Sequence, residues 1–267
     1  MVDVRRQRSI RWFVMVLAIA GAMNFSPACA QKSTLQEQID QHEQKLSAAR
    51  AAKSGREEAT ELNVLGFLYR QSGKMQKALE CLNDALPIEQ NENNQAAQAM
   101  TQNIMGRVYT DLGQEDKALA LFNQALTNWC ALGIRMAEAS TLNYRAKAYD
   151  NLGQPDEALK DLNEALSIWH DLDNGQGKTR MMSPRDRLRN LSQLRALKEL
   201  NDELPPNWRE KSGRAGEAST LDNLGKTYSD MGRGEEAFKY FNLALPIWRE
   251  AGEQSGEALT LNNMGRA

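Results

Sequence analysis

The stretch EASTLDNLGKTYSDMGRGEEAFKYFNLALPIW, residues 217–248, recurs along the chain in altered form. Its first part is repeated as EATELNVLGFLY (58–69), QAMTQNIMGRVY (98–109), EASTLNYRAKAY (138–149) and EALTLNNMGRA (257–267). One small residue marks every copy, and these residues lie 40, 40, 79 and 40 positions apart: Gly66, Gly106, Ala146, Gly225 and Gly265. Such a period indicates a repeat architecture, in which each unit buries its apolar face on its neighbours.

Each unit is predicted to form two helices. The apolar and small residues of the first helix recur on one helical face, as Ala59, Leu62, Leu65, Gly66 and Tyr69. A glycine is expected to end this helix in the left-handed conformation in four units: Gly73, Gly113, Gly153 and Gly232. Pro155 and acidic residues favour the start of the second helix. We expect four small residues at contacts between the two helices: Gly66, Gly106, Ala146 and Gly225.

The paired helices resemble a known family. The pattern G-x-x-Y in the first helix, followed by A-x-x-x-[FL]-x-x-A in the second, is similar to the tetratricopeptide repeat. The 40-residue period resembles the long repeats of kinesin light chains and of bacterial repeat arrays. The resemblance covers about 58–267 and implies an all-α fold, an α-α solenoid in which helix pairs stack into a superhelix.

The period divides the chain into segments. Residues 1–30 are predicted to be a signal peptide, 31–57 an N-terminal helix that caps the array, and 58–267 the solenoid. Within 31–57, the stretch 34–52 is expected to form the single helix. The predicted units are about 58–97, 98–137, 138–177, a degenerate 178–216, 217–256 and a truncated 257–267.

Two units depart from the pattern. In the degenerate unit, Pro184 replaces the small residue, so we expect a loop around 173–183 and one long helix at about 184–204, where the array could bend. The last unit has no second helix, which leaves Leu261 and Met264 under-covered. We therefore expect a fragment of a longer array or a truncated gene product; the alternative is an end covered by a partner or a second copy.

The N-terminus has the three parts of a secretory signal. Four arginines precede an uncharged apolar run at 12–23, and Ala28 and Ala30 form an A-x-A pattern. Cleavage is expected after Ala30, with the mature protein exported to the periplasm or the cell exterior. The weaker alternative is a membrane anchor at residues 12–25, because a spanning helix needs about 20 apolar residues.

Composition argues against several kinds of chemistry. The pI of about 5.9 does not suit a nucleic-acid-binding surface. The chain has two histidines, His42 and His170, which disfavours a metal cluster or a catalytic triad. Cys81 and Cys130 are expected to stay free, because their offset of about 14 Å along neighbouring helices exceeds the roughly 7 Å that a disulfide allows. We predict no enzymatic activity, no cofactor, no metal and no small-molecule substrate.

Two polar ladders are the candidate binding site. The first is made by Asn63, Asn103, Asn143, Asp222 and Asn262, and the second by Phe67, Arg107, Lys147, Lys226 and Arg266. They lie one helical turn apart on the first helices, a face that lines the peptide-binding groove in the family resembled. Asparagine can both donate to and accept from a peptide backbone, while Lys and Arg can hold a carboxylate. We predict an extended, acidic or C-terminal peptide ligand, and positions that lie off the core, so that alanine substitution leaves the fold intact.

Alternatives remain for the ladders and for the function. Duplication alone could have copied the asparagines, whereas the tryptophans are expected in the core between units: Trp129, Trp169, Trp208 and Trp248. The first functional class is an exported, non-enzymatic protein-interaction scaffold. The second is the sensor part of a longer protease of the caspase-like CHAT type, or of a signalling protein, without its effector domain. A third is an array that assembles end to end through its uncapped C-terminus.

Overall fold

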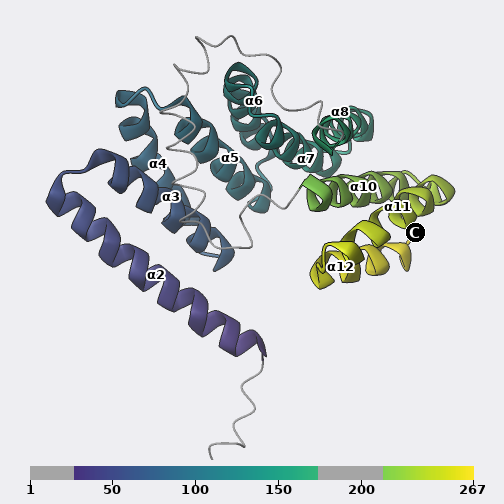
Figure 1. The fold of residues 1–267 in the computed structure, drawn as a ribbon, viewed down its shortest axis with the longest axis horizontal. Helices are drawn as coiled ribbons and strands as arrows, with labels where there is room; N and C mark the ends of the chain where they lie inside the picture. Colours follow the sequence, from purple (N-terminus) through teal and green to yellow (C-terminus); the bar gives the residue numbers. More distant parts are fainter. Residues whose placement is uncertain (1–26, 174–212) are drawn as a thin grey trace, which may run out of the picture. The chain divides into compact units, whose positions relative to one another are not determined.

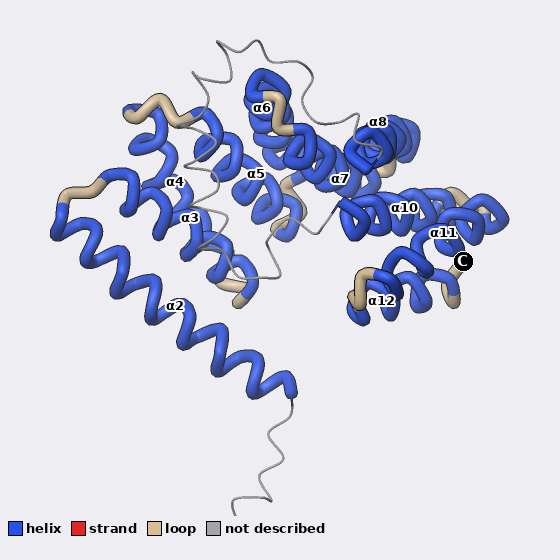
Figure 2. Tube along the Cα trace, in the orientation of Figure 1, coloured by secondary structure: helices blue, strands red, loops and turns tan. Residues whose placement is uncertain are grey.

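The computed structural model describes residues 27–173 and 213–267, and these residues form helices joined by short turns (Figure 1, Figure 2). The expected loop at 173–183, the expected helix at 184–204 and Trp208 lie in the part that is not described, apart from Asp173 itself, which ends a helix. The predicted signal peptide also lies outside it up to residue 26. The helices of the described residues are α2 (Pro27–Ala52), α3 (Gly55–Gln71), α4 (Met75–Asn91), α5 (Gln95–Asp111), α6 (Glu115–Leu132), α7 (Arg135–Asn151), α8 (Pro155–Asp173), α10 (Gly213–Asp230), α11 (Gly234–Glu250) and α12 (Gln254–Met264).

The helices pack in consecutive pairs, which confirms the all-α solenoid. Within residues 42–267, α3 packs on α4, α5 on α6, α7 on α8 and α10 on α11, and the second helix of each pair also packs on the first helix of the next. The single helix predicted at 34–52 is part of α2. Residues up to 41 belong to a separate unit, and α2 contacts the array from His42 onward through the hydrogen bond between His42 and Glu61 on α3.

The turn inside each complete helix pair requires a left-handed residue, as the sequence predicts. Gly113 and Gly153 have φ of +68°, a conformation that a residue with a Cβ adopts only at a cost. Gly73 and Gly232 take the same conformation, with φ of +76° and +73°. The backbone amides of these glycines and their successors return to carbonyls of the preceding helix and so close its C-terminus.

The marking small residues lie where the two helices of a pair cross. A Cβ on Gly106 would come within 2.6 Å of the Phe122 ring, and one on Gly225 within 2.4 Å of the Phe241 ring. Gly66 meets Leu82 in the same way. Ala146 is buried in a cluster with residues of α8 and α10. The prediction of small residues at the helix–helix contacts is confirmed.

The 79-residue gap in the period does not separate the third unit from the fifth. Helix α10 packs directly on α8, as α7 packs on α6. A Cβ on Gly216 of α10 would come within 2.6 Å of the Trp169 indole on α8. The helix pair α10–α11 therefore follows α7–α8 in the stack, although about forty residues lie between them in the sequence.

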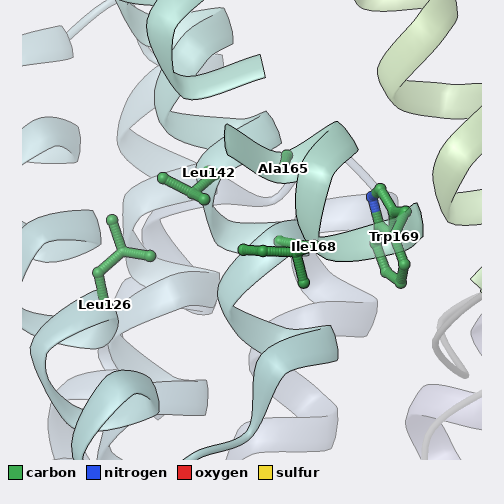
Figure 3. Packing of buried hydrophobic residues seen from close by; sticks show 6 residues of the cluster. Leu126, Leu142, Ala165, Ile168 and Trp169 are labelled. Carbon is green, nitrogen blue, oxygen red and sulfur yellow. The ribbon is translucent and has the colours of Figure 1, made fainter. Parts of the chain in front are cut away.

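Three of the four predicted tryptophans are among the described residues, and these three lie in the core, as predicted. Trp129, Trp169 and Trp248 are buried. Trp169 belongs to a cluster with Leu126 of α6, Leu142 of α7, and Ala165 and Ile168 of α8 (Figure 3). Three helices from two successive units thus share one patch of core, which is how a solenoid transmits order from unit to unit.

Two further expectations, for the cysteines and for the last unit, can be compared with the described residues. Cys81 and Cys130 are free thiols, and burial raises the pKa of both to about 11. In the last unit, Leu261 is exposed and Met264 is half-buried. None of the helices in the described ranges is long and apolar enough to cross a bilayer.

Candidate functional site

The asparagine ladder lies in the interior. Four of its five members are buried: Asn63, Asn103, Asn143 and Asp222. Asn262, in the last helix, is exposed. The expectation that these positions lie off the core is wrong, because successive first helices pack side by side and each buried member faces the next unit. The expectation that alanine substitution at these positions leaves the fold intact depended on their lying off the core.

At two junctions, the threonine two positions before a ladder residue accepts a hydrogen bond from the ladder asparagine of the preceding unit. The Nδ2 atom of Asn103 donates to the hydroxyl of Thr141 at 2.7 Å. Asn143 donates in the same way to Thr220 at 2.8 Å, across the 77 residues that include the gap in the period. The pairing supports the direct stacking of α10 on α7 and α8. The ladder is thus a chain of hydrogen bonds between units, which we call the Thr–Asn junctions.

The junction at Thr220 includes a tryptophan as well. The Trp169 Nε1 atom donates to the Thr220 hydroxyl at 3.0 Å, and this hydroxyl donates to the Gly216 carbonyl at 3.0 Å. The Thr220 oxygen therefore accepts two hydrogen bonds and gives one, which uses its full capacity. Since its hydrogen is committed to Gly216, the atom of Asn143 that faces it must be the donor Nδ2.

The first junction is built differently. Glu89 on α4 occupies the position held by tryptophan in the later units. Asn63 donates to its Oε1 at 2.6 Å, and the Thr101 hydroxyl lies 2.8 Å from both carboxyl oxygens and 2.7 Å from Asn63 Oδ1. Glu89 is 2% exposed. Burial raises the pKa of its carboxyl to about 7, against the lowering effect of the hydrogen bonds from Thr101 and Asn63.

The second ladder is not continuous. Phe67 is buried, Arg107 is half-buried, and Lys147, Lys226 and Arg266 are exposed. The Arg107 guanidinium lies 4.3 Å from the ring centroid of Tyr144 and 5.8 Å from that of Phe67. Burial lowers the pKa of Arg107, which nevertheless stays a cation. Lys226 forms an ion pair with Asp230 at 2.5 Å.

A groove of about 310 Å³ brings four of the predicted residues together. Asn103, Arg107, Asn143 and Lys147 line it. The remaining five predicted residues do not belong to its lining: Asn63, Asp222, Lys226, Asn262 and Arg266. The lining comes from the first helices α3, α5, α7 and α10 and from the tryptophans of α6 and α8, so that the groove crosses four units.

Two polar atoms of this lining lack partners. The Oδ1 atom of Asn143 and the Nε1 atom of Trp129 are buried, and neither has a hydrogen-bond partner among the described residues. Asn143 is 8% exposed and Trp129 is 1% exposed. One atom is an acceptor and the other a donor, which are the two groups that a peptide unit requires.

Sequence reasoning missed part of the groove. Tyr144, Ser140, Ser219, Gln71 and Asn223 also line it. Ser140 and Ser219 occupy the same position of their units, and this recurrence was the one signal that could have revealed them. Tyr144 gave no such signal, because the equivalent positions hold Val64, Ile104 and Asn223.

Comparison with known proteins agrees with this architecture. A sequence pattern described as the tetratricopeptide repeat matches residues 56–131 and 216–267, and a second pattern of the same repeat matches residues 139–168. The chain belongs to the tetratricopeptide repeat family. Tetratricopeptide arrays generally act as scaffolds for protein–protein interaction and are typically non-catalytic, and no enzyme family was detected for this one.

A solved structure shows the same fold at low sequence identity. A putative kinesin light chain from Podosopora anserina with nearly identical TPR-like repeats is 16% identical, with a TM-score of 0.54, and the match covers 84% of this tetratricopeptide chain and 91% of that one. BtubC (BKLC) from P. vanneervenii is 20% identical, with a TM-score of 0.48, over 82% of this chain and 92% of that one. No curated protein sequence matches the chain.

Proposed function

We propose that this tetratricopeptide array is an exported, non-enzymatic scaffold that binds an extended, anionic segment of a partner protein in the groove across α3, α5, α7 and α10. The observation that carries the proposal is the pair of unpartnered buried atoms, Asn143 Oδ1 and Trp129 Nε1, in a groove that also holds two cations. Leaving a buried polar atom unpaired costs about 1–3 kcal/mol, so a ligand that pairs it gains affinity.

The orientation of Asn143 supports a peptide backbone as the ligand. Because Thr220 fixes the Nδ2 atom of Asn143, the Oδ1 atom remains as an acceptor for a ligand N–H group. The Nε1–H group of Trp129 is the unpartnered donor of the same lining and would pair with a ligand carbonyl. A backbone recognised through such groups is bound with little regard to its side chains.

The cations supply the preference for charge. Arg107 is held against Tyr144 and Phe67, so its position in the groove is fixed before a ligand arrives. Lys147 is exposed on the same helix as Tyr144 and lies within reach of solvent anions. The chain as a whole carries a net charge of −2, so a local basic strip would stand out and guide an acidic segment.

A titration with matched variants tests the groove. A peptide array supplies the ligand, and the affinity of that peptide is then measured for the wild type, Lys147→Gln and Lys226→Gln. Lys147→Gln should weaken binding up to about fivefold, the range of exposed charge pairs, and the loss should shrink at high salt. Lys226→Gln is the control, because Lys226 is an equally exposed lysine at the same position of another unit and lies outside the groove lining.

One result would contradict the proposed site, and a second would identify the anion that it binds. Equal affinities of the three proteins for the peptide would contradict the proposed site. An amidated version of the peptide separates the two kinds of anion: a loss on amidation assigns the charge to a C-terminal carboxylate, and no loss assigns it to acidic side chains.

Export is proposed from the N-terminal sequence. Four arginines, the apolar run at 12–23 and the small residues before Gln31 support cleavage after Ala30. N-terminal sequencing of material collected outside the cytoplasm should then begin at Gln31. Recovery of the intact N-terminus in a membrane fraction would favour an anchor instead.

A further inference from the structure

We propose that the buried Glu89 carboxyl holds a proton in the folded protein and closes a ring of three hydrogen bonds, which makes the junction between the first and second units a proton-dependent latch. The ring joins α3, α4 and α5 through Asn63, Glu89 and Thr101. The inference does not depend on the proposed ligand.

The side chains around Glu89 have too few hydrogen-bond donors for an ionised carboxylate. Thr101 has one hydroxyl hydrogen, yet three oxygens surround that hydroxyl at 2.7–2.8 Å: Asn63 Oδ1 and the two carboxyl oxygens of Glu89. If Glu89 were ionised, Asn63 Nδ2 would still donate to Oε1, but the single Thr101 hydrogen would have to serve both Oε2 and Asn63 Oδ1. One of these two oxygens would then face the Thr101 oxygen with no hydrogen between them, in a site from which water is excluded, which is costly.

One additional proton gives each of the four oxygens a place in a closed ring of hydrogen bonds. Protonated Glu89 donates from Oε2 to the Thr101 hydroxyl, Thr101 donates to Asn63 Oδ1, and Asn63 Nδ2 donates to Glu89 Oε1. Each member of this ring gives one hydrogen bond and accepts one. The proton comes from solvent and is bound as the chain folds, so no other reactant is needed.

The surroundings of Glu89 favour the neutral form. From α3 and α5 the groups that face it are Asn63 and Thr101, neither of which titrates, and Gln98 donates to its backbone carbonyl. Glu92, the residue that caps the C-terminus of α4, is the charged group that acts on it, and its negative charge raises the pKa of Glu89 further. Glu61 of α3 pairs with His42 instead. Among these described neighbours, no cation compensates a charge on Glu89.

The direction of the pH effect follows from linkage. Burial raises the pKa of Glu89 from its ordinary value of 4.5 to about 7, so the folded chain keeps a proton that the unfolded chain has released between these values. The resulting stabilisation is complete below pH 4.5, is lost progressively as the pH rises to 7, and is absent above it. The latch therefore loosens on the alkaline side.

The latch is placed where it can affect the groove. Asn63 of the ring lies one turn before Phe67 on α3, and Phe67 and Gln71 line the groove opposite Arg107 of α5. Loss of the ring proton weakens the attachment of α3 to α5. The first unit thus contributes to the groove in a pH-dependent way.

The test uses the full chain and the variant Glu89→Gln. Glutamine keeps one acceptor and supplies permanent donors, so it reproduces the closed ring at every pH. Its melting temperature should exceed that of the wild type by several degrees at pH 8 and equal it at pH 5. The measured quantity is the difference between variant and wild type at each pH, which cancels the contribution of the groups that both proteins share. Glu92→Gln, an exposed change one turn away, should keep most of the pH dependence.

A second measurement on the wild type addresses the proton directly. The side-chain carboxyl carbon of Glu89, assigned by its absence in Glu89→Gln, should titrate in an NMR spectrum with a midpoint near pH 7. A midpoint at the ordinary glutamate value would overturn the proposal, as would a difference in melting temperature between Glu89→Gln and wild type that stays constant with pH.

Discussion

The junction of the first and second units and the junction of the third unit with α10 use the same pair of residues in opposite directions. At the first, Thr101 donates to the Oδ1 atom of Asn63. At the later one, Thr220 accepts from the Nδ2 atom of Asn143. The asparagine amide is therefore turned around, although both residues occupy equivalent positions in their units.

The residue at the tryptophan position explains the reversal. Glu89 takes the donor side of Asn63, so the acceptor side turns to Thr101. Trp169 offers only an N–H group, so Thr220 must accept from it and gives its own hydrogen to the Gly216 carbonyl. Asn63 thus uses both amide atoms inside the fold, whereas the buried Oδ1 atom of Asn143 has no hydrogen-bond partner among the described residues.

The largest difference in stability between the two junctions should appear when the residue at the tryptophan position, Trp169 or Glu89, is replaced by alanine. Trp169→Ala removes an indole that is 2% exposed and packed on Gly216, which should cost about 3–5 kcal/mol. Glu89→Ala leaves the Nδ2 donor of Asn63 without its acceptor and the Thr101 oxygen without its donor, which should cost about 1–3 kcal/mol. Urea unfolding of the two variants measures both. Equal costs would mean that packing of the indole does not dominate the later junction.

Most of the fold could be predicted from the sequence because its signals are local. The glycines of the turns, the small residues at helix crossings and the apolar face of each helix act within one unit, and the period repeats them. The spacing of 79 residues was ambiguous by contrast. The stacking of α10 on α8 depends on the fit of Trp169 against Gly216 across 47 residues, and no pattern within a unit reports such a fit.

The candidate binding site was harder to predict from the sequence, because its contacts join different units. The asparagines stood out as a ladder, but their partners lie in the next unit: Asn63 meets Thr101 across 38 residues and Glu89 across 26. A ladder of polar residues is equally compatible with an exposed face and with a buried seam between helices. Arg107 was found as a cation, while its stacking on Tyr144 depends on a residue that its own unit does not contain.

The asparagines themselves give a smaller test of the comparison. Asn63→Ala removes the central member of the first ring and leaves Glu89 and Thr101 facing each other, so we expect a loss of about 1–3 kcal/mol. Asn143→Ala removes one hydrogen bond from Thr220, which keeps its bonds to Trp169 and Gly216, so we expect about 0.5–1.5 kcal/mol. The free energy of unfolding is measured by urea titration at pH 6, where the ring carries its proton.

Asn262→Ala is the control, and it should change the free energy of unfolding by less than about 0.5 kcal/mol. Asn262 occupies the same position of its unit as Asn63 and Asn143, in the same kind of helix, but it is exposed. If asparagine stabilised these helices through a property of its own, the three substitutions would cost similar amounts. If the following unit supplies the stabilising partner, the cost should fall from Asn63 to Asn143 to Asn262, and any other order would contradict the roles assigned to the junctions.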